Sequence, residues 1–347
     1  MKKLLCLLCG TLLLITMCSC TTADNNSSAA NSTSVSESSK ETVTEEIQSS
    51  KVESAAESTV SQTVSSEQKP ISQPTSSEES TSVEETVNTQ VTIQQKLPQF
   101  SYTVTDAENS RGLSTVKNGF SFGIAKDGVP HQQSVINQKT FDAFENVKAL
   151  ALDTKTQEKI MYLTFDNGYE YKNLTANILD TLKEKNVKAA FFVTLSYAKQ
   201  NPQLIQRMIN EGHIVGNHSA THPSFPKLTR TQMAQEIATL ENYLRENFSY
   251  KGEYFRFPSG EYSECALELA SSIGFKSVFW SVAYADWDTS TQKGADYAFS
   301  TVTSRFHPGA VILLHAVSQD NADALGRIID EAHNQGYAFK TLGEYFD

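Results

Sequence analysis

The first hundred residues contain very few of the residue types that build a folded core. No aromatic residue precedes Phe100, and no glycine lies between Gly10 and Gly112. Between Thr21 and Gln90, 30 of 70 residues are Ser or Thr. Such a composition buries too little apolar surface to offset the entropy lost on ordering. We therefore expect residues 20–97 to form a disordered tether, and the core to lie downstream of it.

Cysteine is also scarce, and four of the five cysteines fall within the first twenty residues. The stretch MKKLLCLLCGTLLLITMCSC has two lysines followed by an apolar run too short for an ordinary membrane span. This pattern predicts a signal peptide over residues 1–19. The small residue before Cys20 resembles a bacterial lipobox, which implies cleavage before Cys20 and a diacylglycerol on its sulfur. A plain secretory signal and modification of Cys18 are the alternatives.

Cys265 is the cysteine that remains after such processing, so an intramolecular disulfide is excluded. It lies in YSECALELA, a helical pattern. We interpret it as a small core residue without chemistry.

Basic charge is sparse as well. The chain has 29 Lys and Arg against 40 Asp and Glu, for a net charge of −11. Twelve of the acidic residues and three lysines lie between Thr21 and Gln90, which leaves a mildly acidic remainder. The lack of a basic stripe argues against nucleic acid as a partner. We expect membrane contact through the Cys20 anchor alone, on the extracytoplasmic side of the cell membrane.

From Lys159 onward, short β-type runs alternate with amphipathic helix patterns. The predicted strands are KIMYLTF, AAFFVT, HIVGNH, YFRFPS, KSVFWSVA, AVILLHA and YAFKTL. Nearly continuous apolar strands of this kind are typical of parallel strands covered by helices. We therefore predict an α/β fold with a closed or nearly closed, TIM-like barrel over residues 159–347. Residues 98–158 are less regular and are predicted to form an N-terminal wrapping segment.

Polar residues follow the ends of five of these strands, where parallel barrels carry their reactive groups. They are Asp166, Asn167, His218, His222, Arg256, Ser259, Asp286, Trp287 and His315. Each one alone has a simpler interpretation, such as a helix cap, a structural ion pair or a core side chain. Their common position at one face of the barrel predicts a site.

Metal-assisted acyl hydrolysis is the chemistry that this set suits. Two imidazoles and an oxygen ligand hold a divalent cation, for which zinc is the first candidate. The ion activates a water molecule and polarises a carbonyl group. Asp166 is positioned to take the proton of the water, and His315 to protonate the leaving nitrogen. Asp286 would orient His315, Arg256 would hold Asp166 ionised, and the backbone N–H of Ser259 would serve an oxyanion.

Five segments, in the order TFDNG, HSATH, RFPSG, ADW and LLH, resemble the motifs of the polysaccharide deacetylases, the family 4 carbohydrate esterases. The resemblance covers roughly residues 159–347. It implies a distorted (β/α)7 barrel that removes acetyl groups from chitin-like glycans, peptidoglycan or xylan. It also implies roles for single residues: Asp166 as base, Arg256 as its partner, His218 and His222 as metal ligands, Asp286 as tuner of His315, His315 as acid, and Trp287 with Leu313 as the pocket for the acetyl methyl group.

Asn167 departs from the family pattern, which usually has a second aspartate there as a metal ligand. A carboxamide oxygen can coordinate a metal but brings no charge. We therefore expect Asn167 to be a metal ligand that gives the site a lowered affinity.

The segments TFDNGYE, FWSVAYADW, TQKG and LLHAVSQDNADAL are similar to one subgroup, the delta-lactam-biosynthetic de-N-acetylases. The segment GFSFG extends this similarity to about Gly119. The resemblance implies deacetylation of N-acetylmuramic acid in peptidoglycan whose stem peptide has been removed. The sequence leaves two alternatives open: a deacetylase of N-acetylglucosamine in peptidoglycan or another glycan, and a lipoprotein that binds glycan without cleaving it.

Overall fold

The computed structural model describes residues 96–347. The predicted signal peptide, the predicted lipidation site at Cys20 and the tether up to residue 95 lie outside the described residues. Within residues 96–347, no helix has both the length and the apolar character needed to cross a membrane.

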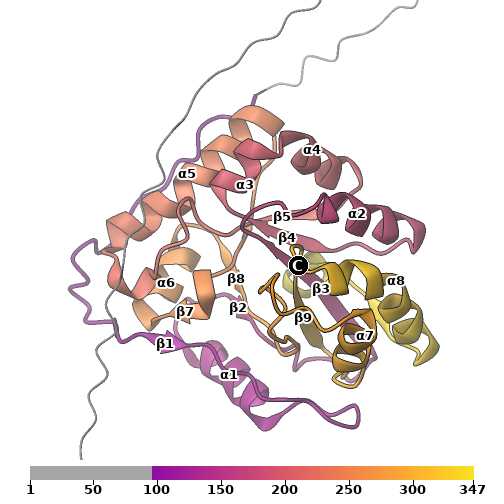
Figure 1. Cartoon of the computed structure of the whole chain (residues 1–347). Coiled ribbons are helices and arrows are strands. Elements are labelled where there is room, and N and C mark those ends of the chain that lie inside the picture. The colour runs from indigo at the N-terminus through magenta and orange to yellow at the C-terminus, as the bar shows by residue number, and fades with distance from the viewer. Residues whose placement is uncertain (1–95) are drawn as a thin grey trace, which may run out of the picture. The chain divides into compact units, whose positions relative to one another are not determined.

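A curved parallel sheet forms the centre of the domain (Figure 1). Its strands are β2 (Ala149–Leu150), β3 (Ile160–Asn167), β4 (Ala190–Val193), β5 (Ile214–Asn217), β6 (Tyr254–Phe255), β8 (Lys276–Val278), β9 (Ala310–His315) and β10 (Ala338–Phe339). The order is β10-β3-β4-β5-β6-β8-β2, and β9 also pairs with β3. A separate antiparallel pair joins β1 (Asn118–Gly119) to β7 (Glu261–Tyr262).

The sheet curls back on itself through the residues that follow β8. The Leu313 N–H donates to the Val282 carbonyl at 2.8 Å, and the Val282 N–H donates to Val311 at 3.1 Å. These bonds link the β8 side of the sheet to β9, which pairs with β3. The predicted distorted barrel is therefore confirmed.

The strand predicted over residues 276–283 is interrupted after Val278, and the N-terminal segment explains why. The Ser277 and Phe279 N–H groups donate to the carbonyls of Lys148 and Leu150, at 2.8 and 2.7 Å. Residues 277–279 are therefore hydrogen-bonded to strand β2 and its flanks, whereas the residues from Ser281 onward are hydrogen-bonded to β9.

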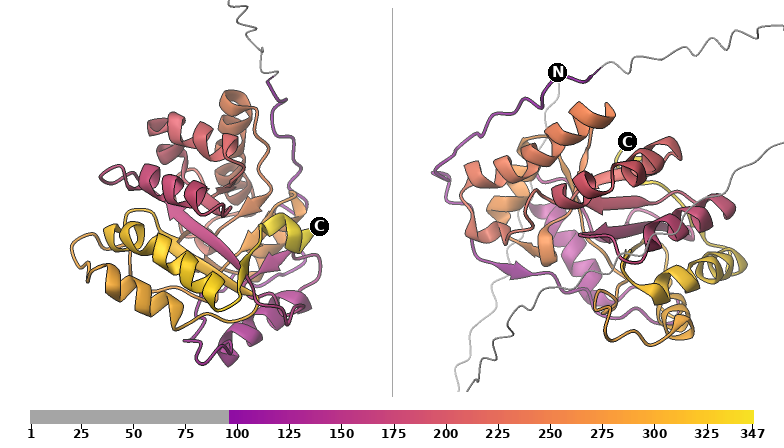
Figure 2. Two further views of the ribbon diagram at one scale, coloured as in Figure 1. Left: turned by 90° about the vertical axis from the view of Figure 1, so that its right-hand side faces the viewer. Right: turned by 45° about the horizontal axis from the view of Figure 1, so that its top comes forward.

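Helices cover the outside of the sheet, as the two views of Figure 2 show. They are α1 (Gln132–Ala143), α2 (Leu174–Glu184), α3 (Leu195–Gln200), α4 (Pro202–Asn210), α5 (Arg230–Phe248), α6 (Glu264–Ser272), α7 (Ala295–Thr303), α8 (Gln319–Asn334) and α9 (Leu342–Phe346). Helix α5 begins with the predicted capping box of Thr229 and Gln232. Cys265 is free and buried in α6, as expected.

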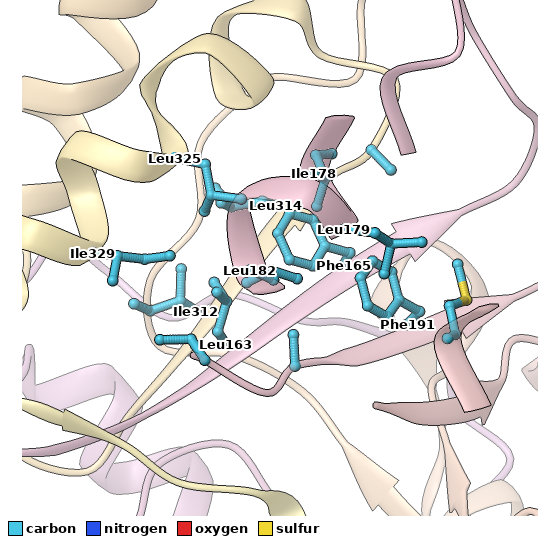
Figure 3. Close-up of a cluster of buried hydrophobic side chains, with 14 of the residues drawn as sticks. Leu163, Phe165, Ile178, Leu179, Leu182, Phe191, Ile312, Leu314, Leu325 and Ile329 are labelled. Carbon is cyan, nitrogen blue, oxygen red and sulfur yellow. The ribbon is translucent and has the colours of Figure 1, made fainter. Parts of the chain in front are cut away.

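Alternation along β3 decides which residues face the helices. Leu163 and Phe165 pack in one buried cluster, together with apolar residues of α2, β9 and α8 (Figure 3). Tyr162 belongs to a different cluster, on the other face of the sheet. Because successive side chains of a strand point to opposite faces, Asp166 lies on the face of Tyr162 and Asn167 on the helix-facing side.

Three details differ from the sequence-based expectations. The wrapping segment contains helix α1 and strand β2, so it is more regular than predicted. Strand β6 ends at Phe255, because Pro258 lacks an N–H for a ladder and Ser259 adopts a left-handed φ of 55°. The predicted strand over residues 337–342 is shortened to β10, because Thr341 and Glu344 form a capping box that starts α9.

Candidate active site

The carboxyl ends of the strands open into a cavity of about 1160 Å³. Seven of the predicted site residues line it: Asp166, His218, His222, Ser259, Trp287, Leu313 and His315. Arg256 and Asp286 are buried and bonded to two of these residues. Asn167 does not line the cavity.

Asp166 ends the inward-facing row of β3 and forms an ion pair with a fully buried arginine. Nη1 of Arg256 lies 2.8 Å from Oδ1 of Asp166. The other guanidinium nitrogens donate to Thr164 Oγ1 and to the carbonyls of Val278 and Phe279, at 2.9 to 3.2 Å. Burial alone raises the pKa of Asp166, but nearby groups, first among them the charged Arg256, outweigh it and lower the pKa below its ordinary value. Asp166 is therefore a fixed carboxylate at neutral pH.

Two histidines lie beside this carboxylate. His218 Nδ1 is 2.9 Å from the carbonyl oxygen of Arg256, and a carbonyl only accepts, so Nδ1 carries the proton. The unprotonated Nε2 lies 3.5 Å from Oδ2 of Asp166. His222 adopts a left-handed φ of 59°, and its ring centroid is 4.8 Å from that of His218. Burial lowers the pKa of His218 to about 4 and also lowers that of His222, so both imidazoles are neutral, as metal ligands must be.

Asn167 is the third predicted metal ligand. Its side chain is fully buried, and Nδ2 donates to Thr175 Oγ1 at 3.1 Å. Its Oδ1 is buried and accepts no hydrogen bond, so one oxygen donor is left without a partner. Within residues 96–347, no group of three or more His, Cys, Asp or Glu side chains is arranged to hold a metal. Two neutral imidazoles at the cavity fit a divalent cation chemically, whereas the carboxamide of Asn167 fits by its donor type alone, because it lies on the helix-facing side of β3 and does not line the cavity. The coordination of Asn167 stays a prediction.

His315 stands at the end of β9, in register with Asp166 on β3. Its Nδ1 donates to Oδ1 of Asp286 at 2.7 Å, and its backbone N–H donates to Oδ2 at 2.8 Å. Burial lowers the pKa of His315, but the hydrogen bond and the charge of Asp286 outweigh it and raise the pKa above its ordinary value. The ring of Trp287 lies 5.7 Å from the imidazole. Two neighbouring strands thus bring to the cavity a carboxylate with a lowered pKa and an imidazole with a raised pKa.

Several contributing residues were not predicted from the sequence. Thr164 holds Arg256, and Asn321 bonds to Asp286. Phe120, Phe122 and Trp280 line the cavity. All five residues lie inside segments that carry the family resemblance, so the sequence signal was present without a role attached to it.

The chain is similar to deacetylases of known family. A family model described as polysaccharide deacetylase matches residues 153–278. The peptidoglycan-N-acetylmuramic acid deacetylase PdaA of Bacillus subtilis is 42% identical over 220 residues, which cover 63% of this chain and 83% of that protein. A peptidoglycan-N-acetylglucosamine deacetylase of Bacillus cereus is 37% identical over 190 residues, 53% of this chain and 67% of that protein.

A solved structure agrees with these similarities. The structure of Bacillus subtilis PdaA, a family 4 carbohydrate esterase, matches with a TM-score of 0.61 and 38% identity, over 67% of this chain and 97% of that one. Deacetylases of this family are in general metal-dependent. Since the similarity spans most of these relatives and the five motifs converge on one cavity, the chain belongs to the polysaccharide deacetylases, the family 4 carbohydrate esterases, and is a hydrolytic deacetylase.

Proposed function

We propose that this protein removes the acetyl group from N-acetylmuramic acid in peptidoglycan. The observation that carries the proposal is the pairing of Asp166 with His315 on neighbouring strands at a single cavity, where the pKa of the carboxyl is lowered and the pKa of the imidazole is raised. The similarity to PdaA over most of its length supports muramic acid as the target.

The reaction is the addition of water to an amide. Asp166 accepts a proton from the water molecule while the water oxygen bonds to the acetyl carbon. His315 then donates a proton to the nitrogen as the C–N bond breaks, which releases acetate and a free amine. Trp287 and Leu313 would hold the methyl group, and the Ser259 backbone N–H would face the oxyanion.

A divalent cation, with zinc as the first candidate, would be held by His218, His222 and Asn167. When bound, it would lower the pKa of the water and polarise the acetyl carbonyl. The neutral imidazoles of His218 and His222 at the cavity support two members of this set. The unpartnered oxygen of Asn167 is a donor of the right type, although the residue does not line the cavity.

The size and lining of the cavity support a glycan as substrate. Phe120, Trp280 and Trp287 give it apolar walls against which pyranose rings can stack. We further propose that the protein acts outside the cytoplasm, anchored through a lipid on Cys20, with peptidoglycan and not nucleic acid as its partner. The signal-like N-terminus and the composition of the tether support this placement.

N-acetylglucosamine is the rival target, which the Bacillus cereus relative favours. A glycan-binding lipoprotein without activity is the rival of another class. Mass spectrometry of peptidoglycan chains with and without stem peptides, incubated with the protein or with His315→Ala, distinguishes the three. Loss of acetyl from muramic acid in peptide-free chains supports the proposal. Loss from glucosamine alone overturns the substrate, and retention of chains without any loss overturns the enzymatic role.

A further inference from the structure

The carboxylate of Asp286 is buried and has a donor on each oxygen. Oδ1 accepts the Nδ1–H of His315, and Oδ2 accepts both the backbone N–H of His315 and the Nδ2 group of Asn321. The two bonds from His315 come from a single residue, so they move with it. Asn321 is the partner that ties this carboxylate to a different element, helix α8.

Asn321 is itself held in one orientation. It is fully buried, and its Oδ1 accepts the hydroxyl of Tyr284 at 2.6 Å. A carboxylate only accepts, so the amide NH₂ must face Asp286 and the amide oxygen must face Tyr284. The backbone N–H of Asn321 donates to Ser318, which caps the helix.

Helix formation does not explain an asparagine at this position. Asparagine lowers helix stability relative to alanine, because its amide competes for backbone hydrogen bonds. The capping role in α8 belongs to Ser318. The hydrogen bonds of Asn321 with Asp286 and Tyr284 offer an explanation for a buried asparagine in the first turn of this helix.

We propose that Asn321 is a positioning residue for the deacetylation: by bridging the Tyr284 hydroxyl and the Asp286 carboxylate, it keeps Oδ1 of Asp286 directed at Nδ1 of His315. The inference rests on the proposed function of His315 as the acid. A clamped carboxylate fixes the tautomer of the imidazole and aims its other nitrogen into the cavity. The charged groups that act on His315 are Asp286, Asp166 on the neighbouring strand β3, and Arg256, and His222 lies within electrostatic reach.

The first test replaces Asn321 with alanine in the full chain. We expect kcat to fall about 10- to 100-fold, as is usual when a buried partner of a catalytic group is removed, with little change in KM. The acid must be protonated, so activity is lost as pH rises through the pKa of His315. Without Asn321, the carboxylate of Asp286 is held less firmly and stabilises the imidazolium of His315 less well. The basic limb of the pH–activity profile should therefore move to lower pH. Gln319→Ala is the matched control, because Gln319 in the same helical turn bonds only to Asp323 on the surface.

A second variant covers the case in which Asn321→Ala does not fold. Asn321→Asp has nearly the same shape, but its carboxylate cannot donate to Asp286 unless the pair shares a proton. We expect a loss of activity near neutral pH that is partly recovered at lower pH. Wild-type kcat and an unchanged basic limb in either variant would overturn the inference.

An NMR titration of ¹⁵N-labelled histidine separates this inference from the proposed function, because it needs no turnover. We expect the pKa of His315 to be lower in Asn321→Ala than in the wild type and unchanged in Gln319→Ala. If the wild-type protein released no acetate from any glycan but these shifts appeared, the function would be wrong and the clamp right. Equal pKa values in all three proteins would refute the clamp, whatever the activity.

Discussion

At the scale of single residues, the site is built from charges that are buried in pairs. Arg256 uses its guanidinium on four oxygen acceptors and packs over the ring of Phe192, with 4.1 Å to the centroid. Such a group has no freedom to move during the reaction. It fixes the position and the ionised state of Asp166, on which the proposed proton transfer depends.

Replacement of Arg256 by methionine should therefore destabilise the protein as well as abolish turnover. The carboxylate of Asp166 would be left buried without its partner, a change that typically costs about 3–5 kcal/mol. Urea denaturation measures this loss. The double variant Arg256→Met with Asp166→Asn should regain part of the stability and none of the activity. Equal stability of the single and double variants would contradict the pairing.

Asn167 is the other residue whose identity has a measurable consequence. Asn167→Asp adds a negative charge at the predicted metal ligand, so divalent metal should bind more tightly. Isothermal titration with Zn²⁺ measures the affinity. The control is Asn177→Asp on the exposed face of α2. Unchanged or weaker binding in Asn167→Asp would show that the residue lies outside the coordination shell.

At the scale of elements, the loop that carries Asp286 and Trp287 is tied to the start of α8. Oδ2 of Asp320 accepts the N–H groups of Lys293 and Gly294, both at 2.7 Å. Gln292 accepts from the Ser318 hydroxyl at 2.7 Å and donates to the Asp286 carbonyl at 3.2 Å. The segments TQKG and SQDN, which stood out in the sequence, are thus two halves of one contact.

Asp320→Ala should loosen this loop while the barrel stays folded. The amides of Lys293 and Gly294 lose their acceptor, so their hydrogen exchange should become faster. We expect kcat to fall, because Asp286 and Trp287 are held less firmly. Asp323→Ala in the same helix is the control, since Asp323 bonds only to Gln319 on the surface. Exchange rates at Lys293 and Gly294 that match the control would show that the hydrogen bonds to Asp320 are not needed to hold this loop.

At the scale of the whole molecule, the N-terminal wrapping segment is part of the domain's core. Phe141 of α1 is buried, and its ring centroid lies 5.0 Å from that of Phe279 and 5.5 Å from that of Tyr262. Phe120 from the same segment lines the cavity and contacts Trp280, with 5.1 Å between the centroids. The segment therefore connects the stability of the barrel to the shape of the substrate site.

Phe141→Ala should lower the free energy of unfolding of the whole domain by about 3–5 kcal/mol, because it leaves a cavity in an aromatic cluster. Thermal and urea unfolding, followed both by fluorescence and by circular dichroism, measure this change. Ile136→Ala, at an exposed position of the same helix, should have little effect. If Phe141→Ala were as stable as Ile136→Ala, helix α1 would not contribute to the stability of the domain's core.

The barrel and the polar ends of its strands could be predicted, because strand periodicity and the position after each strand are local features. Asp166, His218 and His315 were identified in this way. The contacts of Thr164 with Arg256 and of Asn321 with Asp286 join residues far apart in the chain, so no local pattern indicates them. The early ends of β6 and β10 depend on one left-handed serine and one helix cap, which compete with strand propensity.

The central claim is that Asp166 and His315 act as base and acid in glycan deacetylation. The most direct test is acetate release from peptide-free peptidoglycan chains by the wild type and by Asp166→Asn, with the glycan affinity of both proteins measured in parallel. We predict release by the wild type, a loss of roughly 10²–10⁴-fold in Asp166→Asn, and similar affinities for the glycan. Equal acetate release by the two proteins, or none by the wild type, would contradict the account.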